Sequence, residues 1–240
     1  DVGKRVQKKM GKSDFLYARF IANLKHEPTS CQDGLLRGVA DFLSDDESDI
    51  MVVNGYAGTG KTTAMSSVIR TMAEFKSPCV LLAPTGRAAK VLSEYSGRPA
   101  STIHRHIYRQ KSVGGDGFGQ FALAPNRDRD TLYIVDEVSL IGIDSVQGQS
   151  TGQFGSGNLL EDLVAYVRNG VDNRLILVGD AAQLPPVGLE SSPALSKDYM
   201  DMLGEITYAE LTSVVRQQAE SGILYNATRI RSLIYGDSGR

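Results

Sequence analysis

Residues 55–62 read Gly-Tyr-Ala-Gly-Thr-Gly-Lys-Thr, one residue after the apolar run Ile-Met-Val-Val at residues 50–53. This spacing is that of the phosphate-binding loop G-x-x-x-x-G-K-[ST], which joins a strand to a helix. Glycines let the backbone curl so that successive N–H groups point inward at the helix start, and such a nest binds phosphate. A chance glycine-rich turn is the alternative, but the flanking strand and helix patterns argue against it. The stretch therefore predicts an α/β domain that binds a nucleoside triphosphate.

Two side chains at the end of this loop have separate expected tasks. Lys61 reaches the β and γ phosphates as a point charge, and the hydroxyl of Thr62 supplies one oxygen ligand to Mg²⁺. Thr63 lies one residue too late for the ligand role. The residues expected to contact the nucleotide are Gly55, Ala57, Gly58, Thr59, Gly60, Lys61, Thr62 and Thr63.

The composition is that of an ordinary globular protein. Of 240 residues, 41% are hydrophobic and 22% charged, which argues against a disordered or fibrous chain. No apolar stretch approaches the ~18 residues that span a bilayer, and the basic N-terminus leads into no secretory apolar region. We therefore expect a cytoplasmic protein with no membrane partner. Cys31 and Cys79 have neither metal-ligand nor redox spacing and are expected to be reduced thiols.

The N-terminal part of the chain has helical periodicity. Leu16, Phe20 and Leu24 repeat every four residues until Pro28, which predicts a helical appendage over residues 1–29. A second helix is expected to start near Ser30, with Asp33 three residues later as in a capping box. Residues 30–240 are predicted to form one domain.

Three further runs predict strands at residues 79–83, 132–135 and 174–179. They are apolar throughout rather than alternating, which is typical of a parallel sheet covered by helices on both faces. Right-handed crossovers then favour a doubly wound architecture. Two segments rich in glycine and polar residues, 112–129 and 148–157, are predicted to be surface loops.

Polar residues follow two of these strands at the edge where open α/β sheets bind ligands. Asp136 and Glu137 come directly after residues 132–135; we assign Asp136 to Mg²⁺ and Glu137 to the water that attacks the γ phosphate. Alone, this pair would more simply be a solvated strand end. Gln183 precedes two prolines that stiffen its loop, so it is a candidate γ-phosphate sensor; an ordinary proline-stiffened loop is the alternative.

The motifs together resemble superfamily 1 helicases of the RecD-like and Dda-like group. The resemblance covers most of residues 30–220, in the expected order, and the combination is more specific than any single motif. It implies the first RecA-like motor domain of a helicase that uses ATP to move along single-stranded DNA, 5′ to 3′. The segments that carry it are 55–62, 83–89, 102–104, 135–139 and 179–187.

Two further roles come from the resemblance alone. Gln32 is similar to the glutamine that reads the adenine edge; without the resemblance it would be an exposed polar residue at a helix start. Arg216 lies in a segment similar to one whose arginine contacts the γ phosphate; the ordinary alternative is a surface salt bridge. The expected catalytic residues are thus Lys61, Glu137, Gln183 and Arg216.

A basic stretch suggests a DNA surface on a chain whose formal net charge is only −2. Residues 87–111 carry Glu94 as their one acid, although such a run is more often a solvated face. By the resemblance, backbone and hydroxyl groups there contact single-stranded DNA without reading its sequence. The expected contacts are Pro84, Thr85, Arg87, Lys90, Thr102 and His104.

The resemblance also implies a partner domain. Superfamily 1 helicases hold ATP between two RecA-like domains, and the residues after Arg216 show a helical pattern with no second sheet, so we expect the first motor domain alone. One alternative is an ATP-controlled DNA-binding subunit of an exodeoxyribonuclease V-like complex, with other subunits as partners. A different P-loop phosphotransferase is a second alternative, which DNA-stimulated turnover would distinguish.

Overall fold

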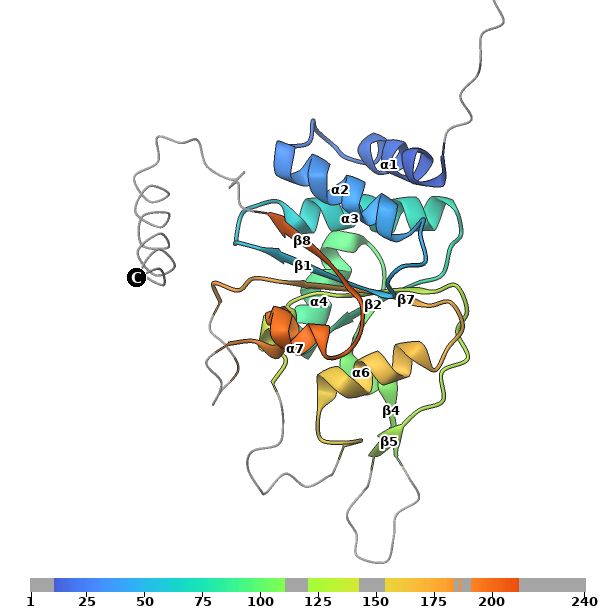
Figure 1. Cartoon of the computed structure of the whole chain (residues 1–240), viewed down its shortest axis with the longest axis vertical. Helices are drawn as coiled ribbons and strands as arrows, with labels where there is room; N and C mark the ends of the chain where they lie inside the picture. The colour runs from blue at the N-terminus through green and yellow to red at the C-terminus, as the bar shows by residue number, and fades with distance from the viewer. Residues whose placement is uncertain (1–10, 111–120, 143–153, 184–185, 187–190, 212–240) are drawn as a thin grey trace, which may run out of the picture.

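The computed structural model describes residues 11–110, 121–142, 154–183, 186 and 191–211. Its main element is a sheet of six parallel strands in the order β3-β2-β6-β7-β1-β8. Figure 1 shows this sheet between helices, with β1, β2, β7 and β8 labelled. The strands are β1 Ile50–Gly55, β2 Cys79–Ala83, β3 Ala100–Thr102, β6 Leu132–Val135, β7 Arg174–Gly179 and β8 Ile206–Leu211. The predicted parallel α/β sheet is therefore confirmed.

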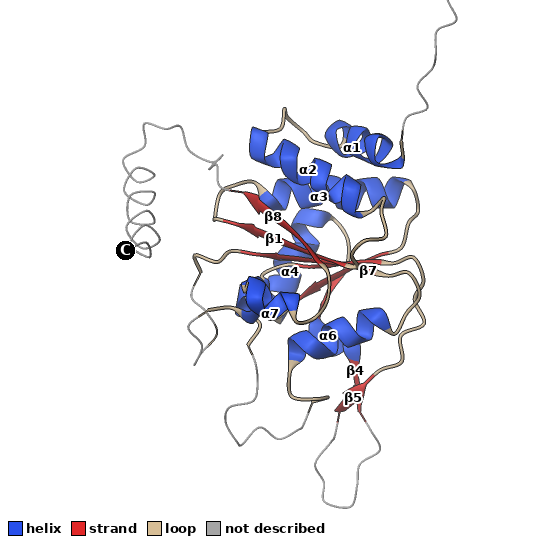
Figure 2. Cartoon of the chain, in the orientation of Figure 1, coloured by secondary structure: helices blue, strands red, loops and turns tan. Residues whose placement is uncertain are grey.

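Helices cover both faces of this sheet, as the continuous apolar strands require. In Figure 2, α1, α2 and α3 lie on one side, with α6 and α7 on the other. These helices span α1 Lys12–Ala22, α2 Ser30–Phe42, α3 Lys61–Glu74, α4 Gly86–Ser96, α5 Ile103–Ile107, α6 Leu159–Arg168 and α7 Lys197–Asp201, with short 3-10 helices η1 at Val138–Leu140 and η2 at Pro193–Leu195.

Alternate residues of each central strand enter different apolar clusters. Met51 and Val53 pack with α1 to α4, whereas Ile50 and Val52 pack with α5, α6 and the segment around α7. All four side chains are at most 2% exposed. Because both faces are buried, a shift of one residue would only exchange one apolar set for the other, so the register depends on the fit of these side chains to the helices.

Helix α2 begins at Ser30 as predicted, but its capping box lies one residue earlier than expected. The capping box is formed by Thr29 and Gln32, not by Ser30 and Asp33: the Thr29 hydroxyl accepts from the Gln32 N–H at 3.2 Å, and the Gln32 amide oxygen accepts from the Thr29 N–H at 3.1 Å. Thr29 has the extended backbone that an N-cap residue needs. Gln32 is therefore held at a fixed place on the first turn of α2.

The predicted boundary at residue 29 is not visible as a break in packing. Leu16 and Phe20 of α1 are buried in the same apolar cluster as α2 and α3. On the outer side, the Arg37 guanidinium stacks over the Tyr17 ring at 3.9 Å. The division into residues 1–29 and 30–240 stays a prediction, and α1 forms part of the helical layer over the sheet.

One predicted loop contains a strand. Within residues 112–129, Phe121–Leu123 forms β5, which pairs antiparallel with β4 at Tyr108–Gln110, so the prediction of a loop is wrong there. The physical reason is aromatic packing: the Phe121 ring stacks on Phe154 with centroids 4.4 Å apart. Residues 112–120 and 148–153 of the two predicted loops lie outside the described residues.

The capping box gives a first prediction. Thr29→Ala should destabilise the chain by about 1 kcal/mol, because the first turn of α2 loses its side-chain acceptor. Ser30→Ala, the neighbouring change at an exposed position, should cost less than about 0.5 kcal/mol. Urea denaturation followed by circular dichroism measures both, and a larger loss for Ser30→Ala would place the cap at Ser30.

Candidate active site

The predicted site residues gather at the carboxyl edge of the sheet. The register pairs Asn54 with Gly179, Val135 with Leu177 and Ala83 with Thr102, so the segments that follow β1, β2, β3, β6 and β7 leave the sheet on one side. Open α/β sheets bind ligands at this edge. The phosphate loop follows β1, the acidic pair follows β6, and Gln183 follows β7.

The phosphate loop has the backbone that its glycines allow. Gly58 and Gly60 have φ of 82° and 89°, in the left-handed region that disfavours other residues. A Cβ on Gly60 would also lie 2.3 Å from the Gln32 amide nitrogen. Thr59 is fully buried and its hydroxyl donates to the Tyr56 carbonyl at 2.8 Å. The loop is thus fixed by its own contacts before the N-terminus of α3.

Lys61 is the first residue of α3 and folds back over this loop. Its ammonium group donates to the carbonyl of Tyr56 at 3.0 Å and to the carbonyl of Gly55. The side chain is half-buried, as are Thr62 and Thr63 in the same turn. A charge held at a helix N-terminus suits a phosphate, because the helix dipole and free N–H groups there also favour an anion.

Gln32 lies against the loop but its amide already has partners. Its nitrogen donates to the Gly60 carbonyl at 3.3 Å, its oxygen accepts from the Thr29 N–H, and the residue is fully buried. Reading an adenine edge would require at least one of these bonds to be exchanged. The expected adenine contact therefore stays a prediction, while the structure places Gln32 beside Gly60.

The acidic pair has a specific backbone and specific partners. Glu137 has φ of 59°, in the left-handed region, and the two carboxylates have different partners. Asp136 accepts from the Glu137 N–H at 2.9 Å on one oxygen and from the Tyr95 hydroxyl at 2.8 Å on the other. The contact with Tyr95 was not predicted, because a tyrosine on an amphipathic helix carries no sequence signal for it.

Gln183 joins the acidic pair to the end of β7. Its amide nitrogen donates to a Glu137 carboxylate oxygen at 3.1 Å, and its amide oxygen accepts from the Ser139 hydroxyl at 3.2 Å. Nearby, the Ala181 N–H donates to the Asn54 side-chain oxygen at 3.0 Å. Hydrogen bonds therefore connect the segments after β6 and β7, and the segment after β7 to the end of β1. Asn54, a polar residue at the end of an apolar strand, is the feature that could have indicated the second link.

The donors at this edge fit Mg²⁺. Hydroxyl and carboxylate oxygens, here from Thr62 and Asp136, are ligands that Mg²⁺ prefers, and this ion is commonly held by one or two protein groups together with substrate phosphates. The described residues contain no cluster of three or more His, Cys, Asp or Glu that could hold a metal ion by themselves.

Two of the expected DNA contacts come from neighbouring strands of the sheet. Thr85 lies two residues after β2 and Thr102 is the last residue of β3. Each hydroxyl caps a helix by accepting at 3.2 Å, from the N–H of Ala88 and of Arg105 respectively. A capping hydroxyl still has its own proton to donate outward. Thr85, Arg87 and Lys90 are exposed, whereas Pro84, Thr102 and His104 are half-buried.

The expected catalytic residue Arg216 and its segment lie outside the residues that the structure describes.

His104 packs edge-on against Phe154, with ring centroids 5.3 Å apart. His106 is packed between Tyr133 and Tyr166, and burial lowers its pKa.

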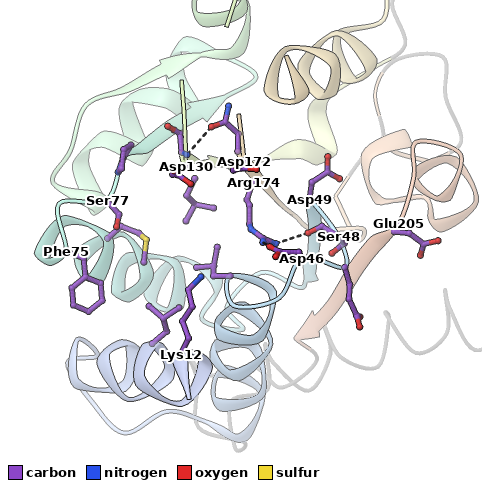
Figure 3. A pocket seen from close by; sticks show the side chains of 18 residues that line it. Lys12, Asp46, Ser48, Asp49, Phe75, Ser77, Asp130, Asp172, Arg174 and Glu205 are labelled. Atoms are coloured by element: carbon purple, nitrogen blue, oxygen red, sulfur yellow. Dashed lines mark hydrogen bonds and ion pairs between the residues drawn. The ribbon is translucent and has the colours of Figure 1, made fainter. Parts of the chain in front are cut away.

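A cavity of about 740 Å³ opens at the opposite, amino edge of the sheet. Figure 3 shows that acidic side chains surround it, with Arg174 among them. Arg174 donates to the carbonyls of Phe42 and Ser48 and to the Asp46 carboxylate, at 2.7 to 2.9 Å. The acidic residues that line the cavity are Asp46, Glu47, Asp49, Asp130, Asp172 and Glu205. Such an acidic lining repels a triphosphate, so this cavity does not suit a nucleotide, whereas the groups at the carboxyl edge do.

Comparisons with known proteins agree with the motifs. A family model described as an AAA domain matches residues 43–189. The chain is 34% identical, over 79% of its length and 22% of the relative's, to the ATP-dependent RecD2 DNA helicase of Deinococcus radiodurans. It is 46% identical, over 38% of its length and 21% of the relative's, to the ATP-dependent DNA helicase dda of Enterobacteria phage T4.

A third relative is a subunit of a larger enzyme. The RecBCD enzyme subunit RecD of Mycolicibacterium smegmatis is 28% identical over 75% of this chain and 33% of its own length. The chain therefore spans between about a fifth and a third of the length of these three relatives.

Lys61→Ala should weaken binding of a fluorescent ATP analogue roughly 10-fold to 100-fold, because charge-assisted hydrogen bonds are worth about 1.5–3 kcal/mol each. Lys76→Ala removes the same charge at an exposed position just after α3 and should leave binding unchanged. Equal affinities for the two variants in a fluorescence titration would contradict the placement of phosphate at this loop.

Proposed function

This chain belongs to the AAA domain family, whose model matches residues 43–189, and from that premise we propose that it is the ATP-hydrolysing motor domain of a DNA helicase. The similarity to RecD2, Dda and RecD confirms the RecD-like resemblance of its motifs. The proposed reaction is hydrolysis of ATP with Mg²⁺, coupled to movement along single-stranded DNA.

One observation carries this proposal: Gln183 is hydrogen-bonded to Glu137 at the same edge of the sheet at which the phosphate loop leads into α3. A water-orienting carboxylate must lie within hydrogen-bond reach of the water it activates. A γ-phosphate sensor must contact this carboxylate and must also lie near a group that moves when the phosphate leaves. Gln183 contacts the carboxylate directly, and a hydrogen bond to Asn54 links its segment to the end of β1.

The proposed roles follow from these contacts. Lys61 leaves the loop carbonyls to bind the β and γ phosphates, which exchanges a neutral acceptor for a charged one. Glu137 orients the attacking water and takes its proton, and Gln183 holds that carboxylate in place. Thr62 and Asp136 would hold Mg²⁺, which neutralises charge on the phosphate oxygens. Arg216 is proposed to contact the γ phosphate, on the resemblance.

The nucleic-acid side of the proposal rests on charge and on the relatives. Exposed Arg87 and Lys90 lie on α4 next to Thr85, and acids concentrate at the other edge of the sheet. We propose contacts to the phosphate backbone from these three residues and from Pro84, Thr102 and His104. Such binding is independent of base sequence and weakens as salt increases. Movement from 5′ to 3′, a role in DNA repair and a cytoplasmic location are parts of the same proposal.

The partners proposed are a second RecA-like domain of the parent chain and single-stranded DNA. Among the described residues, no helix is both long and apolar enough to cross a membrane. An arginine supplied across a cleft between domains commonly contributes ~10³ to 10⁵ in rate. We propose that such an arginine comes from the second domain.

A second candidate is an ATP-controlled DNA-binding subunit of a multi-subunit complex with no unwinding activity of its own. The similarity to the RecD subunit of the RecBCD enzyme favours it. Strand separation by the purified parent protein alone would support the motor, whereas ATP-dependent DNA binding without strand separation would support the subunit. A phosphotransferase of another kind would show no stimulation of turnover by DNA.

Glu137→Gln should keep ATP binding but lower DNA-stimulated turnover by about 10² to 10⁴, because the amide cannot accept the water's proton. Glu94→Gln makes the same change on the exposed face of α4 and should retain the wild-type rate. Phosphate release measures turnover, and nucleotide binding is followed in parallel. Normal turnover by Glu137→Gln would remove Glu137 from its proposed role.

The dependence on a second domain is tested by comparing two lengths of chain. Residues 1–240 should hydrolyse ATP ~10³-fold or more slowly than the chain extended through the following domain, both at saturating single-stranded DNA. ATP affinity should differ far less than the rate. Equal turnover by the two proteins would show that this domain needs no group from a partner domain.

A further inference from the structure

Tyr95 connects a helix outside the expected phosphate site to the acidic pair. It lies in the last turn of α4, and its hydroxyl donates to an Asp136 oxygen at 2.8 Å. Its ring packs against the apolar cluster that α3 and α4 share with the sheet. The hydroxyl therefore reaches the carboxylate from a partly buried ring whose packing restricts the position of the hydroxyl.

The two oxygens of Asp136 are held from different directions. The Glu137 N–H donates to one oxygen at 2.9 Å, and Tyr95 donates to the other. An ionised carboxylate offers about four lone-pair sites, so each oxygen keeps one for a metal ion or a metal-bound water. The two hydrogen bonds fix the plane of the carboxylate and leave an acceptor position open on each oxygen. This is how groups behind a metal ligand orient the ligand.

The Tyr95 phenol is the donor in this bond. An ionised carboxylate only accepts hydrogen bonds and a tyrosine hydroxyl supplies an O–H, so the contact has one direction, from Tyr95 to Asp136.

The same bond fixes one end of α4 to the acidic pair. The other end of α4 is capped by Thr85 and carries Arg87 and Lys90, the residues of the proposed DNA surface. Helix α4 therefore has the proposed DNA contacts on its first turns and a hydrogen bond to Asp136 on its last turn.

We propose that Tyr95 is a positioning residue that orients the Asp136 carboxylate for Mg²⁺. This inference rests on the proposed function, because it assumes that Asp136 serves the metal that accompanies ATP. It assigns no contact between Tyr95 and the substrate. Tyr95 acts only through the carboxylate it holds.

The test uses the full-length parent protein with Tyr95→Phe, which removes the hydroxyl and keeps the ring. Affinity for Mn²⁺ in the presence of ADP, measured by electron paramagnetic resonance, should fall roughly 10-fold, as is typical when a partner of a metal ligand is lost. DNA-stimulated kcat should fall by a similar factor, and KM for ATP should change less than about twofold, because the phosphate loop is intact.

Tyr133→Phe is the matched control. Tyr133 is also a tyrosine whose hydroxyl donates to a carboxylate, that of Asp128. Its loss should lower thermal stability without changing Mn²⁺ affinity. Wild-type Mn²⁺ affinity and kcat in Tyr95→Phe, whatever its melting temperature, would reduce Tyr95 to a packing residue and overturn the proposal.

A double-mutant cycle tests whether Tyr95 acts through Asp136. Asp136→Asn should weaken Mn²⁺ binding, and adding Tyr95→Phe should then have little further effect, because the carboxylate that it orients is gone. Independent, multiplicative losses would overturn the proposal. If the wild-type parent shows no DNA-stimulated ATP turnover, the proposed function fails instead, and the Mn²⁺ measurements still decide whether Tyr95 holds a metal-binding carboxylate.

Discussion

The parallel register of β1, β6 and β7 is the constraint on which the candidate site depends. β7 pairs with both β1 and β6, so it sets the height at which the phosphate loop and the acidic pair leave the sheet. Buried apolar side chains on both faces hold that register. A strand displaced along its axis would separate Gln183 from Glu137, whose contact is only 3.1 Å long. The site is therefore a product of core packing as much as of its own polar residues.

The polar groups of the candidate site are hydrogen-bonded to one another. Lys61 donates to loop carbonyls, Gln32 donates to Gly60, and Gln183 bridges Glu137 and Ser139. Each bond costs little to exchange if the ligand offers an equal or a charged acceptor in return. Binding of a triphosphate would then replace the neutral carbonyl acceptors of Lys61 by anionic phosphate oxygens. Gln183 already contacts Glu137, so a change at the γ phosphate would reach the segment after β7 through this bond.

Sequence reasoning succeeded where one local pattern decides the structure. The loop at residues 55–62 and the apolar strands were predictable, because glycine spacing and continuous burial leave few alternatives. It missed β8, whose residues alternate in exposure at the edge of the sheet, and it misplaced the capping box by one residue. The bond between Tyr95 and Asp136 joins residues 41 positions apart, so it depends on how α4 packs. No spacing rule could reveal it.

The most direct measurement is a crystal structure of this chain with Mg²⁺ and a non-hydrolysable ATP analogue. The account predicts that the phosphates lie on the N–H groups before α3, with Lys61 on the β and γ phosphates. Glu137 and Gln183 should then face the γ phosphate from the same side. A triphosphate bound at the amino edge beside Arg174, or acidic and amide groups pointing away from it, would contradict the account.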